Sequence, residues 1–284
     1  MEKIAILGDT SQDLDFNLAK QFHIELLPYY ISMDETSVKD LVDIDKETFF
    51  RTMDDYEEVK SGVPSANDVL EILSRLEEEG YTDVIMMTST VKLTGMHALY
   101  YSLLQMDPVL KLHIIDTGTV ASAAGLLVIE AAKLRDQGLD VNSILNRIHE
   151  LKEKTRVRAA FQTLKYVVKG GRLGKLAGAV GSLLNINPLL TIEDNEIAIT
   201  DKARGAKKGL KLLADHLRED LEGVKNYHIV TFHGDSQQEY DLFKKENQEI
   251  INQANLAIES RLASVLGVYT GPKVVGYSIL TLDD

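Results

Sequence analysis

Short apolar runs alternate with segments of helical periodicity along the first half of the chain. The runs are rich in Ile, Leu, Val and Met and predict buried strands over residues 4–7, 25–32, 84–89 and 112–117. Between the second and third runs, residues 68–80 repeat apolar side chains along one helical face, and a glycine ends the pattern. This order predicts βαβ units, and therefore a parallel sheet with helices on both faces.

Polar clusters directly follow three of these predicted strands. In a parallel sheet, ligands bind beyond the carboxyl ends of the strands. The clusters therefore supply candidate pocket residues, of which we single out Thr10, Ser11 and Thr119. Each cluster could equally cap the helix that follows it. The clusters are Asp9-Thr10-Ser11, Thr88-Ser89-Thr90 and Asp116-Thr117-Gly118-Thr119.

The pattern changes near residue 155, where a charged helix (143–155) ends and a new strand (156–164) begins. We therefore predict two domains, 1–155 and 156–284. The first is a three-layer α/β domain with a parallel sheet, and the second is a mixed α/β (α+β) domain, because hairpin strands alternate there with helices. The later segments are strands at 188–194, 196–204, 227–235, 258–263 and 274–280, with helices at 207–220 and 238–254.

Composition narrows the classes of function. The chain has 284 residues, enough for two cores, and a net charge of −13. Nucleic-acid binding requires clustered Lys and Arg, and no long basic stripe is present. The sequence has no apolar run of signal or transmembrane length, so we expect a cytoplasmic protein without stable membrane insertion. Zero cysteines and seven scattered histidines predict no metal site, and we expect no cofactor.

Residues 164–175 (LKYVVKGGRLGK) place glycines among basic residues in an otherwise acidic chain. A Walker phosphate loop needs G-x-x-x-x-G-K-[ST], but Lys169 occupies the first glycine position and a leucine follows the final lysine. The alternative is a helix stop, in which Gly170 and Gly171 supply the left-handed backbone that ends a helix.

Seven segments occur in the order and spacing of the DegV family, which the chain resembles along nearly its whole length. Members of that family are two-domain bacterial proteins that bind one long-chain fatty acid. Several serve as FakB, the acyl-carrier subunit of a fatty acid kinase whose separate catalytic subunit phosphorylates the carboxyl group. The resemblance implies a binding protein with a ligand pocket between its domains and no chemistry of its own. The segments are GDTSQDL, SGVPS (61–65), LTG (93–95), DTGTVASAAG (116–125), KGGRLGKLAGAVGSLLNINPLL (169–190), the KAR of DKARGAKKG, and YTGP (269–272).

The resemblance also implies which residues bind the carboxylate. A T-S-Q-P-S-like run of the family aligns with SGVPS and gives Ser61, and an L-S-G-T-like run aligns with Leu93 to Met96 and gives Thr94, beside Gly95. Where many relatives have H-T-G-P, this chain has Tyr269 followed by Thr270. Tyrosine donates a hydrogen bond but cannot become cationic near neutral pH. His97 is a candidate substitute for that imidazole, or else a helix-surface residue.

The family's glycine-loop segment suggests two further features. Small residues around Gly178 leave room for a slender ligand, or for close packing of a helix on a sheet. Lys169, Arg172 and Lys175 would form a basic rim at the pocket mouth, where Arg172 could meet an acidic kinase surface or the acyl phosphate. A solvated loop is the alternative for these three residues.

Two other classes of function compete with a kinase-linked carrier. One is a stand-alone enzyme, an acyl hydrolase or small-molecule phosphotransferase, that would use Ser11 with Asp9 and a histidine such as His233. The sequence contains no G-x-S-x-G elbow to support it. The other is a lipid sensor or buffer that binds acyl chains and never meets a kinase.

Overall fold

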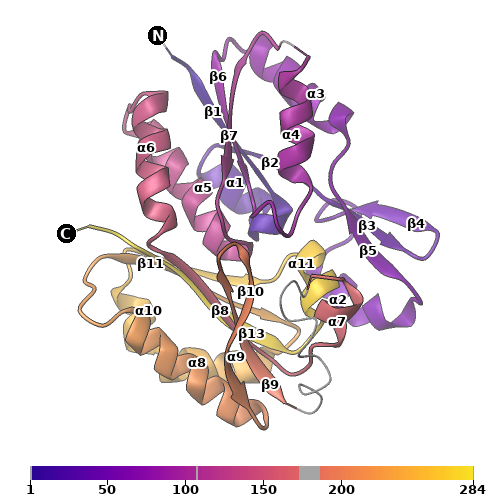
Figure 1. Ribbon diagram of the computed structural model, residues 1–284, viewed down its shortest axis with the longest axis vertical. Coiled ribbons are helices and arrows are strands. Elements are labelled where there is room, and N and C mark those ends of the chain that lie inside the picture. Colours follow the sequence, from indigo (N-terminus) through magenta and orange to yellow (C-terminus); the bar gives the residue numbers. More distant parts are fainter. Residues whose placement is uncertain (1, 107, 173–185, 284) are drawn as a thin grey trace.

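Two large β-sheets lie on opposite sides of one buried helix, α5 (Ala121–Asp136), in the computed structural model (Figure 1). The structure describes residues 2–106, 108–172 and 186–283. Thirteen of the sixteen residues of α5 are buried, since its small and aliphatic side chains suit a helix that is covered on all sides. The helix therefore belongs to the first half of the chain but packs against both sheets.

The first sheet is parallel, with the strand order β2-β1-β6-β7. Helices α3 (Ala66–Glu78) and α4 (Met96–Leu104) cover one face, while α1 (Phe16–Gln21), α5 and α6 (Val141–Lys152) cover the other. Both faces are buried, as the near-continuous apolar runs predict. The predicted parallel sheet is therefore confirmed. Its strands are β1 (Ile4–Asp9), β2 (Ile24–Leu27), β6 (Asp83–Thr88) and β7 (Lys111–Asp116).

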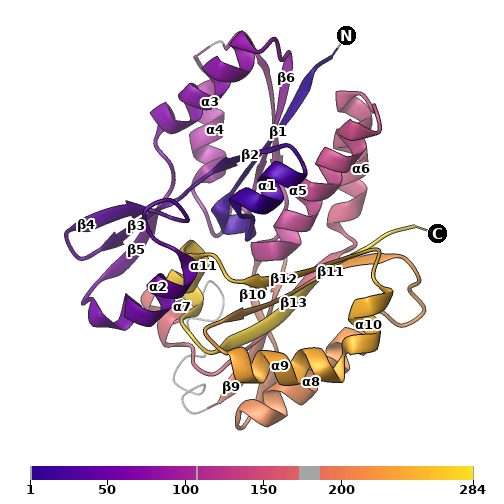
Figure 2. The ribbon, with the colours of Figure 1, turned by 180° about the vertical axis from the view of Figure 1, so that it is seen from behind.

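The second sheet is mixed and has six strands in the order β10-β9-β8-β13-β11-β12, of which only the β11–β12 pair is parallel. Helices α8 (Ala206–Asp220), α9 (Gln237–Glu246) and α10 (Gln248–Gln253) cover the face turned away from α5 (Figure 2). The predicted mixed α/β second half is confirmed. The strands are β8 (Thr155–Phe161), β9 (Asn187–Glu193), β10 (Glu196–Ala203), β11 (Tyr227–Gly234), β12 (Leu256–Arg261) and β13 (Val274–Thr281).

A small antiparallel sheet, β4-β3-β5, projects from the first half beside α2 (Lys46–Thr52). The single strand expected over residues 25–32 is wrong, because Pro28 interrupts it: β2 joins the parallel sheet, and β3 joins the small one. Proline lacks the N–H that a continuous strand would need there. The small sheet comprises β3 (Tyr30–Met33), β4 (Thr36–Lys39) and β5 (Val59–Gly62), and short 3-10 turns lie at Thr10–Gln12 and Met53–Asp55.

Two short helices complete the fold; the first ends at the predicted glycine stop, and the second was not predicted from the sequence. The strand expected over 156–164 ends at Phe161 and is followed by α7 (Lys165–Lys169). Helix α11 (Ser264–Thr270) lies between the last two strands. Gly171, with φ of 69°, ends α7 as expected, whereas Gly170 keeps a helical backbone with φ of −75°.

The domain boundary near residue 155 stays a prediction. It falls directly after Thr155, the first residue of β8, but α5 packs against strands on both sides of it. Within the described part of the chain, no helix is long and apolar enough to cross a membrane.

Candidate functional site

A cavity lies between the inner face of the mixed sheet, α11 and the carboxyl ends of the parallel strands. Its empty volume is about 1070 Å³, part of which is open to solvent. Residues from both halves of the chain line it, in agreement with the preference of ligands for the carboxyl edge of a parallel sheet.

The walls along the mixed sheet are apolar because of strand alternation. Val157, Ala159 and Phe161 of β8 line the cavity, whereas Ala160 packs on the opposite face against the helices. The same period of two brings Leu190 and Ile192 of β9 to the cavity. The remaining apolar lining residues, on the mixed sheet and elsewhere, are Val63, Leu93, Val120, Ala121, Val167, Ile197, Phe232, Leu262, Val265, Leu266 and Val274.

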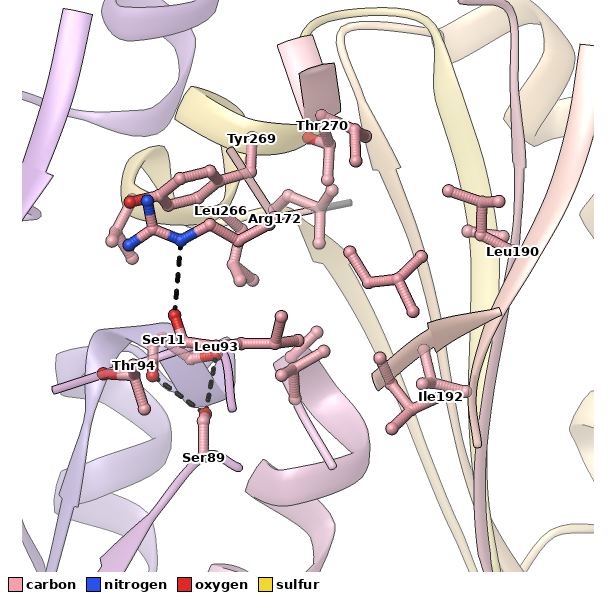
Figure 3. A pocket seen from close by; sticks show the side chains of 18 of the residues that line it. Ser11, Ser89, Leu93, Thr94, Arg172, Leu190, Ile192, Leu266, Tyr269 and Thr270 are labelled. Atoms are coloured by element: carbon pink, nitrogen blue, oxygen red, sulfur yellow. Dashed lines mark hydrogen bonds between the residues drawn. The ribbon is translucent and has the colours of Figure 1, made fainter. Parts of the chain in front are cut away.

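Hydroxyl groups gather at the other side of the cavity. Ser61 on β5 and Tyr269 in the last turn of α11 lie with their oxygens 2.6 Å apart. The Thr94 hydroxyl, just before α4, forms a short hydrogen bond with the hydroxyl of Tyr29. The structure therefore brings together the three residues that the sequence assigned to the carboxylate, and adds Tyr29. Figure 3 shows Thr94, Ser89 and Tyr269 on one side and Leu190 and Ile192 on the other.

A second polar layer lies at the ends of β1 and β6. The Ser11 hydroxyl donates to Asp9 Oδ1 at 2.5 Å and lies 2.9 Å from the Ser89 hydroxyl (Figure 3). Asp9 is fully buried, and this burial raises the pKa of its carboxyl to about 7 even though hydrogen bonds from Ser11 lower it. Ser11 and Ser89 line the cavity, so the buried carboxyl group of Asp9 lies directly behind its polar side.

Arg172 supplies a fixed positive charge at this side of the cavity. Its guanidinium carbon lies 4.4 Å from the centre of the Tyr269 ring, a cation–π arrangement. Nη1 donates to the Gly170 carbonyl at 2.7 Å, and Nε donates to the Leu93 carbonyl at 3.5 Å. The charge of Arg172 therefore lies beside the Tyr269 ring at the polar side of the cavity.

The other predicted site residues divide into three groups. Gly95 and Thr270 line the cavity. Four others do not line it, namely Thr10, Thr119, His97 and Lys169. Thr10 Oγ1 accepts from the Tyr29 N–H, and the Thr119 carbonyl accepts from the Thr90 N–H. His97 stacks on the exposed Tyr101, and Lys169 donates to the Glu57 carbonyl. Lys175 and Gly178 lie outside the described residues.

The residues of the hydrolase alternative do not assemble. His233 is buried, which lowers the pKa of its imidazole, and Nδ1 accepts from the Ser236 N–H at 3.2 Å. No hydrogen bond among the described residues joins Ser11 to His233, and no histidine of the described ranges lines the cavity. Within residues 2–106, 108–172 and 186–283, no group of His, Cys, Asp and Glu could hold a metal ion.

Sequence reasoning missed Tyr29, Ser89 as a lining residue, and the whole of α11. Tyr29 follows Pro28 in an apolar run, where a core position was the natural interpretation. Pro28 separates β2 from β3, which begins at Tyr30, and this proline was the sequence feature that could have placed Tyr29 outside a continuous core strand.

The fold and the cavity define an α/β protein with an internal, mainly apolar ligand pocket that is polar on one side. The family described as "uncharacterised protein, DegV family" matches residues 3–282, and the chain belongs to the DegV family. A DegV domain-containing protein of Clostridium acetobutylicum is 33% identical over 281 residues, covering 99% of both chains. The family resemblance seen in the sequence is therefore confirmed.

Solved structures share this fold across their whole length. A DegV family protein of Thermus thermophilus, described for its fatty acid binding, matches with a TM-score of 0.90 at 22% identity, covering 99% of this chain and 100% of that one. The fatty acid kinase B3 protein of Streptococcus pneumoniae, loaded with linoleic acid, matches with a TM-score of 0.80 at 24% identity over 100% of both chains. The similarity confirms the predicted two-domain fold.

Proposed function

We propose that this protein binds one long-chain fatty acid in the cavity, with its carboxylate at the hydroxyls and its tail along the mixed sheet. The observation that carries this proposal is the division of the cavity into an apolar wall and one polar side. About 14 methylenes at roughly 0.8 kcal/mol each contribute near 11 kcal/mol before association costs. A hydrogen bond to the charged head adds about 1.5–3 kcal/mol, so the tail holds the ligand and the hydroxyls orient it.

The hydroxyl pairs have the donors that a carboxylate needs. In a bonded pair of hydroxyls, one proton lies between the two oxygens, and the second proton stays available. Ser61 with Tyr269, and Thr94 with Tyr29, therefore offer one free O–H each, which matches the two carboxylate oxygens. Arg172 beside Tyr269 adds a positive charge.

We further infer that the bound fatty acid is presented to a separate kinase subunit in the cytoplasm, and that the protein has no catalytic activity of its own. Support comes from the similarity to the fatty acid kinase B3 protein of Streptococcus pneumoniae. Neutral hydroxyl donors also suit a head group that must later accept phosphate, because they stabilise the carboxylate without a buried ammonium group. Arg172, at the edge of the cavity, would take part in the handover.

Mass spectrometry of the purified protein tests ligand binding. Native spectra before and after solvent extraction should show a mass loss equal to one fatty acid per chain. A variant with a filled cavity, Ala159→Phe, should carry less ligand or a shorter one, whereas Ala98→Phe, an exposed position on α4, should load as the parent does. A protein that is empty and takes up no added fatty acid would contradict the proposal.

A transfer assay tests the carrier role separately. Loaded protein is incubated with ATP and a bacterial fatty acid kinase catalytic subunit, and acyl phosphate is measured. Formation of acyl phosphate supports the carrier function, while binding without transfer favours the lipid sensor or buffer. Turnover of a chromogenic acyl ester that Ser11→Ala abolishes would instead support the hydrolase.

A further inference from the structure

Helix α11 carries several cavity-lining residues, although it belongs to the second half of the chain. Val265, Leu266, Tyr269 and Thr270 line the cavity from this one helix of seven residues. An isolated helix of this length is not stable in water, so tertiary contacts must hold its position. The contacts at its start come from the first half of the chain.

The carboxylate of Asp40 binds the first turn of α11. Its Oδ1 accepts from the Ser264 N–H and its Oδ2 from the Val265 N–H, both at 3.2 Å. Asp13 Oδ1 accepts from the preceding Ala263 N–H at 2.9 Å. Asp40 is fully buried, so these N–H groups would have no water to replace it.

The backbone of Asp40 is hydrogen-bonded to Tyr29, whose hydroxyl pairs with that of Thr94. The Asp40 N–H donates to the Tyr29 carbonyl at 2.9 Å, and the Tyr29 hydroxyl bonds that of Thr94. Asp40 thus lies between the two groups that would bind the carboxylate: its side chain holds the helix of Tyr269, and its backbone holds Tyr29.

Close packing at the middle of α11 opposes a change in its register. A Cβ placed on Gly267 would lie 2.6 Å from the ring of Phe49 and 2.8 Å from that of Phe50, so α2 touches the helix backbone directly. At 3.6 residues per turn, a shift of one residue would turn Tyr269 by about 100° and remove it from Ser61. The register of α11 is therefore fixed by Asp40 at its start and by Gly267 at its middle.

We infer that Asp40 is a positioning residue for the head group, which it orients through Tyr269 and Tyr29 without touching the ligand. This inference rests on the proposed binding of a fatty acid. It predicts that loss of the Asp40 carboxylate weakens recognition of the head group and leaves the contacts of the tail in place.

The test compares palmitate with the fatty alcohol of the same chain length, because the two ligands share a tail and differ in their head groups. Asp40→Asn replaces one acceptor by an NH₂ group that faces a backbone N–H. We expect the preference for acid over alcohol to fall about ten- to hundredfold, the effect of one hydrogen bond to a charged group. Tyr269→Phe should lower it similarly, and the double variant should lose little more than either single variant.

Two further variants keep the test decisive. Asp140→Asn changes an exposed carboxylate that caps α6, and it should leave the preference unchanged. Ser264→Pro removes one N–H from the first position of α11, and the extended backbone of Ala263, with φ of −58° and ψ of 148°, is compatible with a following proline. If Asp40→Asn does not fold, Ser264→Pro should show the same loss of preference for the acid over the alcohol.

The results separate the inference from the function on which it rests. A parent protein that binds neither palmitate nor the alcohol contradicts the proposed function before any variant is compared. Normal selective binding in the parent, with equal losses for acid and alcohol in Asp40→Asn or Ser264→Pro, contradicts the positioning role alone. Fully additive losses in the double variant also contradict it, because Asp40 would then act independently of Tyr269.

Discussion

The Ser61 hydroxyl and the Tyr269 hydroxyl lie 2.6 Å apart, although 208 positions separate them in the chain. One belongs to the small antiparallel sheet and the other to α11, so the contact joins the two halves of the molecule at the polar side of the cavity. Arg172 stacks on the same tyrosine ring. A head group bound here would meet donors and charge from three separate segments.

Tyr269→Phe should weaken fatty acid binding by about ten- to hundredfold, the effect of one hydrogen bond of about 1.5–3 kcal/mol to a charged group. The ring remains, so the stacking with Arg172 remains. Isothermal titration against palmitate measures the change. Thr281→Val removes a hydroxyl at the far end of β13, outside the cavity, and serves as the control. Unchanged affinity in Tyr269→Phe would show that this hydroxyl does not meet the ligand.

Ser61→Ala should reduce phosphorylation of the bound acid far more than it reduces binding. The tail supplies most of the binding free energy, whereas Ser61 contributes to the orientation of the carboxylate. Affinity and the initial rate of acyl phosphate formation are measured on the same preparation. Equal losses in both quantities would mean that the division between tail and head group is wrong.

Arg172→Met should lower the affinity for fatty acid and the rate of transfer, because it removes the fixed charge beside the hydroxyls. Arg172→Lys keeps a charge but loses the planar stacking on Tyr269, so it should recover only part of the affinity. Lys169→Met is the matched control, since Lys169 is exposed and does not line the cavity. Equal effects of the two methionine substitutions would contradict a specific role for Arg172.

Part of the fold follows directly from the sequence. Buried parallel strands have apolar side chains on both faces, and β1 and β6 show that pattern, while α3 (Ala66–Glu78) shows the single apolar face of a helix that covers a sheet. The small sheet does not, because its strands have only four residues each and β4 (TSVK) is largely exposed and polar. Helix α11 has the sequence SVLGVYT, with valines and a glycine that disfavour a helix, so it depends on tertiary contacts such as those of Asp40 and α2.

Part of the candidate site could also be predicted from the sequence. Ser61, Thr94 and Tyr269 were assigned from the family resemblance, and the structure brings them to one side of the cavity. Tyr29 could not be assigned, because its role depends on the break between β2 and β3 and on the position of Thr94, two long-range relationships. Thr10 and Thr119 follow strands of the same sheet edge, yet neither lines the cavity, and the Thr10 hydroxyl instead accepts from the Tyr29 N–H.

Stability should fall as the pH rises through neutrality, because of Asp9. The pKa of its carboxyl is about 7 in the folded protein, above the ordinary value of 3.8. Between these values the folded state keeps a proton that the unfolded state has lost, so the free energy of unfolding decreases from about pH 4 to pH 7. The decrease is on the order of 4 kcal/mol.

Asp9→Asn should flatten this pH dependence, as measured by urea unfolding from pH 5 to pH 8. Some slope should remain, because burial also raises the pKa of Asp13 to about 6. Asp140→Asn should keep the parent slope, since hydrogen bonds to the Ser143 backbone and hydroxyl lower the pKa of that exposed carboxyl. Parallel curves for the parent and Asp9→Asn would contradict a protonated Asp9 behind the cavity.

The most direct test of the binding proposal is a crystal structure of the protein saturated with a fatty acid brominated at its terminal carbon. The anomalous signal of bromine locates the end of the tail independently of the carboxylate density. We predict the carboxylate within hydrogen-bond distance of Ser61 and Thr94, and the bromine against the apolar wall of β8 and β9. Bromine at the hydroxyls, or a ligand outside this cavity, would contradict the account.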